Sequence, residues 1–387
     1  MDRDGRYAQL DALRGVAALT VVLSHFTLLA PLLGLRHTPL RLFCGGHEAV
    51  ILFFALSGFV LTLQIDGARQ PGYGEYAIRR ICRIYLPYAG AIAFAYACYV
   101  FTYGGTVDWA GPWFNGGWQP TLAGVDLVRH VLFVLPFQSD RLDPVVWSLV
   151  YEMRISLIFM PIVVVMRYLP TWCSLFGAAA ISLAVGVHAM WTAHPVIQAS
   201  VSAEWLPTLH YLLMFVAGGA LAKHRREIAA RLSGTPAAGR LGFVVLGGSL
   251  LLYAAARPMS FVVSGVLSDY LFDWFVLLAV CGIIASAVSV ASFARLLLVW
   301  PLPFLGKISY SLYLFHAVVL LAVVHVSATS LGATWSLILA ALMIVPVSYL
   351  GYVCLERPGI SLGGLLARKL ASGRTPTQRA APIDASR

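Results

Sequence analysis

Ten separate stretches of the chain are long and apolar enough to cross a lipid bilayer as helices, and they constrain the fold more than any other feature. Crossing about 30 Å of hydrocarbon takes about 20 helical residues, and a helix satisfies its own backbone hydrogen bonds where lipid offers no partner. We therefore predict an all-α integral membrane protein. The stretches lie near residues 10–33, 47–65, 84–103, 144–168, 172–192, 207–223, 240–256, 269–291, 306–327 and 334–356.

Charged residues are scarce and unevenly placed. They make up 11% of the 387 residues, against about a quarter in a soluble domain. Of the 27 Lys and Arg residues, 20 fall in the N-terminus, the C-terminus and the loops after every second span, and five fall in the opposite loops. This bias predicts that both termini are cytoplasmic. The net charge of +10 then reflects topology and contact with anionic membrane lipid, and does not indicate nucleic-acid binding.

The spans leave two other regions to assign. The stretch 121–137 is apolar but carries an Asp, an Arg, a His and a Pro, so we interpret it as interfacial or re-entrant. We expect residues 1–360 to form one transmembrane domain and 361–387 to form a cytoplasmic, disordered tail.

The first span is too long for the apolar region of a cleaved signal peptide, so we expect it to be retained. The six cysteines show no metal-binding spacing, so we expect neither a metal site nor a disulfide.

Two ionisable residues lie inside the first span. Arg14 and His25 are eleven residues apart, so on a helix they lie within roughly 20° of the same face. An ionisable residue at membrane depth is costly and is a functional hypothesis by default. We expect the pair to line one side of a buried channel, with His25 deeper than Arg14.

Later spans contribute further polar residues. Glu152 and Arg154 face different sides of the fourth span because they are two residues apart. Glu152 is therefore expected to pair elsewhere, with Arg14 or His25 as candidates, or to form a purely structural buried pair. His316 lies about ten residues into the ninth span and is the second histidine at membrane depth.

Arg79, Arg80 and Arg83 cluster at the entrance of the third span, where Arg83 shares a helix face with Arg80 at i,i+3 and with Arg79 at i,i+4. One interpretation is an ordinary positive-inside anchor. The other is a phosphate clamp, because the guanidinium fork binds phosphate oxygens bidentately. Three arginines in five residues are denser than topology alone requires.

Two further features allow a structural and a functional interpretation. Ser57-Gly58, in the middle of the second span, allows close helix packing or contributes to a site. The outer loop 104–143 is rich in Trp and Gly, including Trp109, Trp113 and Trp118. These aromatic side chains form an interfacial belt or offer flat apolar faces to a sugar ring.

Five motifs occur in order along most of the chain, over roughly residues 7–360, and together they resemble the acyltransferase-3 family of integral membrane acyltransferases. They read Leu10-Asp11-Ala12-Leu13-Arg14-Gly15 with an Arg-x10-His spacing to His25; Phe53-Phe54-Ala55-Leu56-Ser57-Gly58-Phe59; Arg80-x-x-Arg83; Trp147-Ser148-Leu149-x-x-Glu152; and Ser309-Tyr310-Ser311-Leu312-Tyr313-x-x-His316 followed by Glu356-Arg357-Pro358.

The resemblance implies a ten-helix domain in the bacterial cytoplasmic (inner) membrane that takes an acyl group, acetyl by default, from cytoplasmic acyl-CoA. The acceptor it implies is a hydroxyl of a glycan, a lipid-linked sugar or a small molecule. Many relatives carry a further extracytoplasmic hydrolase-like domain, and the sequence ends about thirty residues after Glu356 without one. Many relatives also have an aromatic pair after the position of Glu152, where this chain has Met153-Arg154; this departure bears on acceptor preference.

The chemistry of acyl transfer suggests a role for each candidate. A base must take the hydroxyl proton, and His is suited because its unperturbed pKa of about 6.5 lies near working pH. We assign His25 as general base, Arg14 as charge partner and Glu152 as orienting group, with direct transfer and an acyl-histidine both open. The arginine cluster, Arg79, Arg80 and Arg83, is expected to hold the acyl-CoA phosphates. Acceptor or supporting contacts are expected from Ser57, Trp147, Ser148, Tyr310 and His316.

Two other functions fit the same residues less well. A proton-coupled transporter also needs buried His, Arg and Glu, but the sequence shows no inverted repeat and the arginine cluster is dense. A non-catalytic partner in a glycan-export complex would require that neither His25 nor Arg14 mattered.

Overall fold

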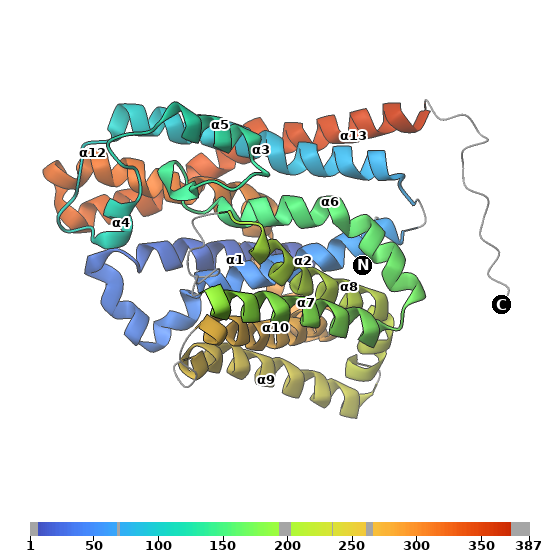
Figure 1. Cartoon of the computed structure of the whole chain (residues 1–387). Coiled ribbons are helices and arrows are strands. Elements are labelled where there is room, and N and C mark those ends of the chain that lie inside the picture. Colours follow the sequence, from blue (N-terminus) through green and yellow to red (C-terminus); the bar gives the residue numbers. More distant parts are fainter. Residues whose placement is uncertain (1–6, 68–69, 193–202, 234, 261–265, 373–387) are drawn as a thin grey trace.

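The fold was analysed in a computed structural model that describes residues 7–67, 70–192, 203–233, 235–260 and 266–372. Figure 1 shows long helices packed side by side, most of them running along one common direction, and the described residues contain no strand. The long helices are α1 (Ala8–Phe26), α2 (Gly46–Ile65), α3 (Tyr73–Thr102), α6 (Trp147–Tyr168), α7 (Thr171–Thr192), α8 (Leu206–Ser233), α9 (Pro236–Ser260), α10 (Val266–Ser289), α12 (Leu302–Gly351) and α13 (Arg357–Ser372).

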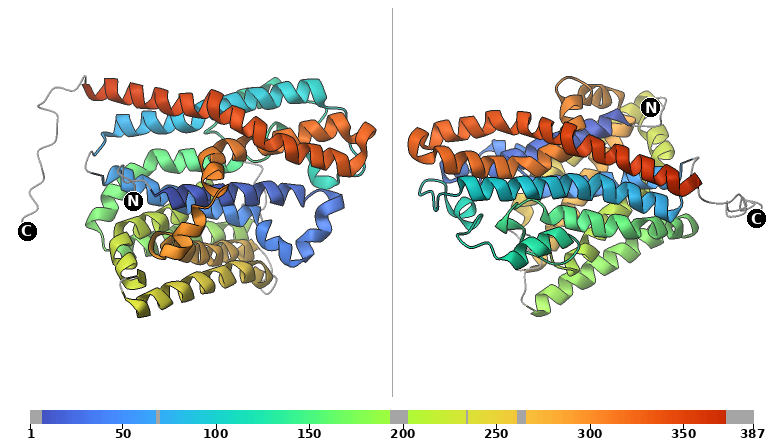
Figure 2. Two further views of the ribbon diagram at one scale, coloured as in Figure 1. Left: turned by 180° about the vertical axis from the view of Figure 1, so that it is seen from behind. Right: turned by 90° about the horizontal axis from the view of Figure 1, so that it is seen from above.

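The predicted all-α membrane architecture is confirmed. Eight helical stretches among the described residues are long and apolar enough to cross a membrane, or nine if a bent pair counts as one span. Each of the ten predicted stretches falls largely within a helix, and α12 covers the last two of them. Gly332, with φ of 69°, interrupts α12, and the Ser327 hydroxyl donates to Ser336 Oγ at 2.8 Å across the bend. Figure 2 shows the chain turning back there.

Several predicted boundaries are wrong. The first helix ends at Phe26 instead of continuing to residue 33, and a 3₁₀ segment (Ala30–His37) follows at an angle of 120°. His25 therefore lies in the last turn of α1. Helix α3 begins at Tyr73, so the arginine cluster lies inside it. The basic stretch after residue 223 extends α8 as far as Ser233.

The two regions assigned outside the spans have different outcomes. Residues 124–132 form α5, which is too short to span a membrane, buries His130 and exposes three of its valines. The disorder predicted from residue 361 is wrong for 361–372, because α13 continues to Ser372; residues 373–387 lie outside the described residues. Helix α13 packs along α3, with Gly359 against the Cys82 carbonyl (Figure 2).

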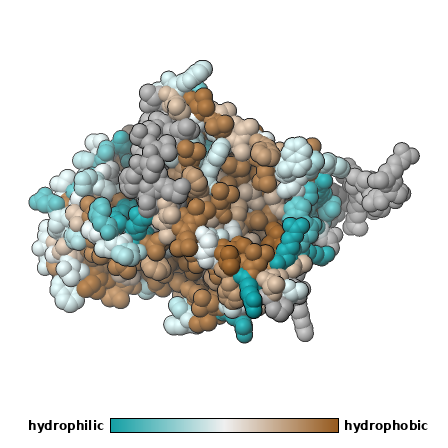
Figure 3. Space-filling model, turned by 90° about the horizontal axis from the view of Figure 1, so that it is seen from below, coloured by the Kyte–Doolittle hydropathy of each residue, from teal (hydrophilic) through white to brown (hydrophobic). Residues whose placement is uncertain are grey.

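The surface of the bundle is apolar between more polar ends. Figure 3 shows a brown band across the middle of one face, with hydrophilic residues gathered at its two ends. Large apolar side chains point outward from the helices that form this perimeter, among them Trp191 (87% exposed), Leu251 (73%) and Leu342 (67%). Such exposure is costly in water and is expected of a surface that faces lipid.

Close contact between α1 and α12 determines which residues meet in the interior. A Cβ on Gly15 would meet the backbone of Gly306, and a Cβ on Gly306 would meet the backbone of Asp11. Small residues let membrane helices approach this closely. Gly15 and Gly306 are 291 residues apart, the same separation as His25 and His316, whose rings are hydrogen-bonded. The register set at the glycine pair therefore brings the two histidines together.

We predict that Gly306→Ala weakens the packing of α1 on α12. A methyl group has no space at this crossing, and overpacking of this kind costs about 1–3 kcal/mol. Thermal unfolding of the detergent-solubilised protein should therefore occur at lower temperature. Gly364→Ala is the matched control, since a Cβ at Gly364 meets nothing within 4 Å. Equal unfolding temperatures for the two variants would contradict this account of the crossing.

Candidate active site

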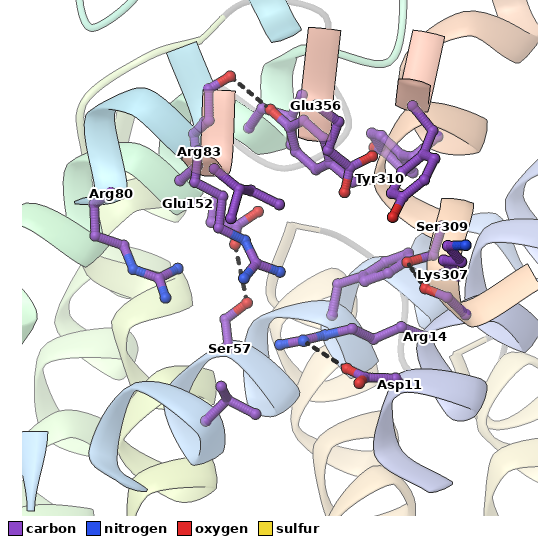
Figure 4. A pocket seen from close by; sticks show the side chains of 18 of the residues that line it. Asp11, Arg14, Ser57, Arg80, Arg83, Glu152, Lys307, Ser309, Tyr310 and Glu356 are labelled. Carbon is purple, nitrogen blue, oxygen red and sulfur yellow. Dashed lines mark hydrogen bonds and ion pairs between the residues drawn. The ribbon is translucent and has the colours of Figure 1, made fainter. Parts of the chain in front are cut away.

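A cavity of about 1030 Å³ opens between α1, α2, α3, α6, α12 and the start of α13. Figure 4 shows side chains from these helices converging on it. Five basic and three acidic side chains belong to its described lining, so its charge favours an anionic ligand. These are Arg14, Arg80, Arg83, Lys307 and Arg357, with Asp11, Glu152 and Glu356.

The arginines of the cavity differ in their surroundings. Arg80 is only 7% exposed, and its guanidinium donates to Gln64 Oε1 at 3.0 Å. Arg14 is paired with Asp11 at 3.6 Å, one turn away on α1. Arg83 is half-buried and also lines the cavity, but Arg79 is exposed and does not. Only two of the three clustered arginines are therefore placed to hold a ligand in this cavity.

Glu152 enters the cavity from α6 (Figure 4), and the Ser57 hydroxyl donates to its Oε1 at 3.0 Å. Among the described residues Glu152 pairs with neither Arg14 nor His25, so the predicted pairing is wrong. Arg154, two residues further along α6, is a structural group. Its guanidinium donates to three backbone carbonyls at 2.7–2.9 Å and lies 4.0 Å from the centre of the Trp205 ring.

The opposite wall comes from α12 and the turn that follows it. A π-helical turn, Tyr352–Glu356, joins α12 to α13 and buries the Glu356 carboxylate, which accepts from the Ser311 hydroxyl at 2.7 Å. Tyr310 donates to the Ile84 carbonyl at 2.8 Å. Sequence reasoning treated Glu356 only as part of a motif at the membrane border, although a carboxylate beside an apolar span was the signal that could have marked it.

Tyr313 and Ser148 lie at the inner end of the cavity. Their hydroxyl oxygens are 2.7 Å apart, and Tyr313 also donates to the Val145 carbonyl at 3.0 Å. The Phe53 ring packs edge-on against Tyr313, at 5.7 Å between centroids. All three side chains line the cavity, and Tyr313 itself is only 4% exposed. Tyr313, Ser148 and Phe53 thus form one hydrogen-bonded and closely packed part of the cavity lining, which we call the inner wall.

The two histidines lie beyond this wall. His316 is fully buried, its ring centroid is 6.1 Å from that of Tyr313, and its Nε2 is 3.0 Å from Nδ1 of His25. Neither histidine lines the cavity. The sequence predicted one channel lined by Arg14 and His25, but of these two residues only Arg14 lines the cavity.

A second, smaller cavity of about 190 Å³ lies between α12 and the segment before α6, and one of its lining residues contacts His25. Trp113, which lines it, packs against the His25 ring with 5.0 Å between ring centroids. Asp140 also lines it, and its buried Oδ1 has no hydrogen-bond partner. His25 thus contacts Trp113 of the small cavity, and it is connected to Tyr313 of the large cavity only through His316. The predicted site residue Trp147 lines neither cavity and stacks on His47 instead.

A buried polar network that the sequence did not reveal lies outside the two cavities. The Asp273 carboxylate accepts from His47 at 2.7 Å and from His210 at 3.0 Å, and His210 also bonds to Ser182 at 2.7 Å. Asp273 and His210 are fully inaccessible to solvent. The network ties α2, α7, α8 and α10 together, so His210 is a structural group.

A comparison with protein families decides how this site is interpreted. The model of the acyltransferase domain, acyltransferase-3, matches residues 7–353, nearly the whole chain. The chain belongs to the acyltransferase-3 family. Searches of curated proteins and of solved structures found no match. Membership of this family supports a multi-pass membrane acyltransferase and does not favour the proton-coupled transporter.

One titratable group beside the site gives a pH-dependent prediction. Asp143, in the loop before α6, is fully buried, and burial raises its pKa to about 8. Since this pKa is raised above its unfolded value, the folded protein binds the extra proton, and folding stability falls as pH rises between about 4 and about 8. Asp143→Asn removes this contribution, so the variant's unfolding temperature should fall less between pH 5 and pH 8 than that of the wild type. Identical pH dependence would contradict the burial of an ionisable Asp143.

Proposed function

We propose that the protein is an acyl-CoA-dependent O-acyltransferase. It moves an acyl group, acetyl by default, from cytoplasmic acyl-CoA to a hydroxyl of a glycan, a lipid-linked sugar or a small molecule. The observation that carries the proposal is a cavity rich in arginine whose lining residue Tyr313 packs against one of a pair of hydrogen-bonded histidines. The positive-inside charge bias supports cytoplasmic termini, and the bacterial cytoplasmic (inner) membrane is the location that the family implies.

The donor would bind in the large cavity. Its phosphates need several cations, and guanidinium groups suit them because they bind phosphate oxygens in pairs. Lys307 and Arg357 are exposed, whereas Arg80 is buried and Arg83 half-buried, so positive charge continues inward from the surface. The cavity volume of about 1030 Å³ lies at the upper end of the range for ligand pockets, about 300–1,000 Å³, as a molecule with a long arm requires.

The thioester must pass the inner wall to reach His25. The acyl group at the end of the pantetheine arm would lie against Tyr313, Ser148 and Phe53. For transfer, Tyr313 has to rotate away from Ser148 and break their hydrogen bond. The closed wall then has a function, because it keeps water and protons from leaking between the two cavities while no donor is bound.

The reaction follows from these positions. His25 takes the proton from the acceptor hydroxyl, whose oxygen attacks the thioester carbonyl carbon and forms a tetrahedral oxyanion. The oxyanion collapses, the carbon–sulfur bond breaks, and the imidazolium of His25 returns its proton to the departing thiolate. Arg14 and Glu152 supply charge on the donor side, where Ser57 holds the Glu152 carboxylate in place.

The acceptor would approach His25 from the small cavity. The Trp113 ring offers a flat apolar face there, and the unpartnered carboxylate oxygen of Asp140 can accept from a sugar hydroxyl. This arrangement would let donor and acceptor reach the same imidazole from opposite sides without sharing a cavity. Membrane lipid surrounds the bundle and could carry a lipid-linked acceptor to the site.

Arg83→Ala should weaken binding of acetyl-CoA by about tenfold or more, because a hydrogen bond to a charged group contributes about 1.5–3 kcal/mol. Titration of the detergent-solubilised protein with acetyl-CoA measures this. Arg79→Ala is the matched control, since Arg79 lies four residues earlier on the same helix but outside the cavity. An unchanged affinity for acetyl-CoA in Arg83→Ala would contradict the phosphate-binding role and leave the arginine cluster as a topological anchor.

His25→Ala should abolish acyl transfer while the protein still inserts into the membrane, because the variant has no base for the acceptor hydroxyl. Mass spectrometry of surface glycans and lipid-linked sugars compares cells with the intact gene, without it and with the variant. The wild type should add one acyl mass that the other two lack. His37→Ala, which changes an exposed histidine, is the control. Acylation that persists in the His25→Ala cells would show the assignment to be wrong.

A further inference from the structure

The hydrogen bonds around the two histidines determine which of their ring nitrogens carry protons. Nδ1 of His316 lies 3.0 Å from the Leu312 carbonyl oxygen and 2.8 Å from the Tyr313 carbonyl oxygen. Carbonyl oxygens only accept, so this nitrogen must be the N–H donor. In a neutral imidazole the other nitrogen is then an acceptor. Nε2 of His316 therefore presents a lone pair.

The same reasoning extends to His25. Its Nδ1 lies 3.0 Å from the Val21 carbonyl oxygen and 3.0 Å from Nε2 of His316. Both neighbours are acceptors, so Nδ1 of His25 carries the proton and is shared between them. The opposite tautomer would set its lone pair against two others. Nε2 of His25 is consequently unprotonated, which is the form that a general base requires.

We propose that His316 is a positioning residue that holds His25 in its basic tautomer and stabilises the imidazolium formed during transfer. This inference rests on the proposed function. When Nε2 of His25 takes the acceptor proton, Nδ1–H becomes a charged donor, and its hydrogen bond to Nε2 of His316 strengthens. The proton on Nδ1 stays there, so His316 shares the charge without changing its own protonation. No acyl group or substrate touches His316.

Its burial explains why a second histidine fits this role. His316 is fully buried and does not line the donor cavity, and its ring packs edge-on against Tyr313, which does. An aspartate would carry a full negative charge into the same place, where desolvation is costly. A neutral imidazole provides an acceptor without that charge. The backbone carbonyls of α12 fix its orientation, and the glycine crossing described above fixes its distance from His25.

Substitution by two amides that differ by one methylene tests the proposal. A glutamine oxygen at position 316 can reach the place of the imidazole Nε2, whereas an asparagine oxygen is too short. The assay follows transfer of radiolabelled acetyl from acetyl-CoA to the native acceptors of membranes that contain each variant, per inserted protein. We expect His316→Gln to keep kcat within about threefold of the wild type. His316→Asn should lose about ten- to a hundredfold in kcat, as for a lost hydrogen bond to a charged group, with an unchanged KM for acetyl-CoA.

Other results separate the alternatives. Equal kcat values for the Gln and Asn variants, or a wild-type kcat in His316→Leu, would overturn the positioning role. A purely structural role predicts a lower unfolding temperature for all three variants with no difference in kcat per folded protein, and this also counts against the proposal. A wild-type protein that transfers no acetyl would instead overturn the proposed function itself.

Discussion

The contact between Gly15 on α1 and Gly306 on α12 is the constraint on which the site depends. Neither position has space for a Cβ, so the two helices meet backbone to backbone. His25 and His316 follow these glycines at equal intervals, and the crossing places their rings 3.0 Å apart between nitrogens. The same crossing brings Arg14 and Asp11 to the wall of the cavity beside Lys307. A packing contact between small residues thus sets the geometry of the titratable ones.

The polar groups of the interior avoid the cost of isolated charge in lipid because each is paired with a nearby polar group. Around the cavity, Arg80 is paired with Gln64, Glu152 with Ser57 and Glu356 with Ser311. On the far side of the bundle, Asp273 satisfies two histidines. Most of these contacts join helices distant in the chain, so the groups that would be costly alone also hold the bundle together.

The sequence allowed the helical architecture and much of the cavity to be predicted, because apolar length and ionisable residues in apolar helices are both local signals. Arg14, Arg80, Arg83 and Glu152 were identified in this way, and they do line one cavity. Partners across the bundle were not predictable: Glu152 bonds to Ser57, 95 residues away. The wall at Tyr313 and the end of α1 at Phe26 also depend on tertiary packing. No periodicity in the sequence reports such contacts.

The central claim is that an acyl-CoA held by arginines delivers its thioester past Tyr313 to His25. A structure of the protein with a non-hydrolysable acetyl-CoA analogue tests it most directly. The account predicts phosphates on Arg80 and Arg83, Tyr313 turned away from Ser148, and the acyl carbon about 4–6 Å from Nε2 of His25, with room for one hydroxyl between them. Phosphates bound away from these arginines, or an acyl group stopped behind an unmoved Tyr313, would contradict it.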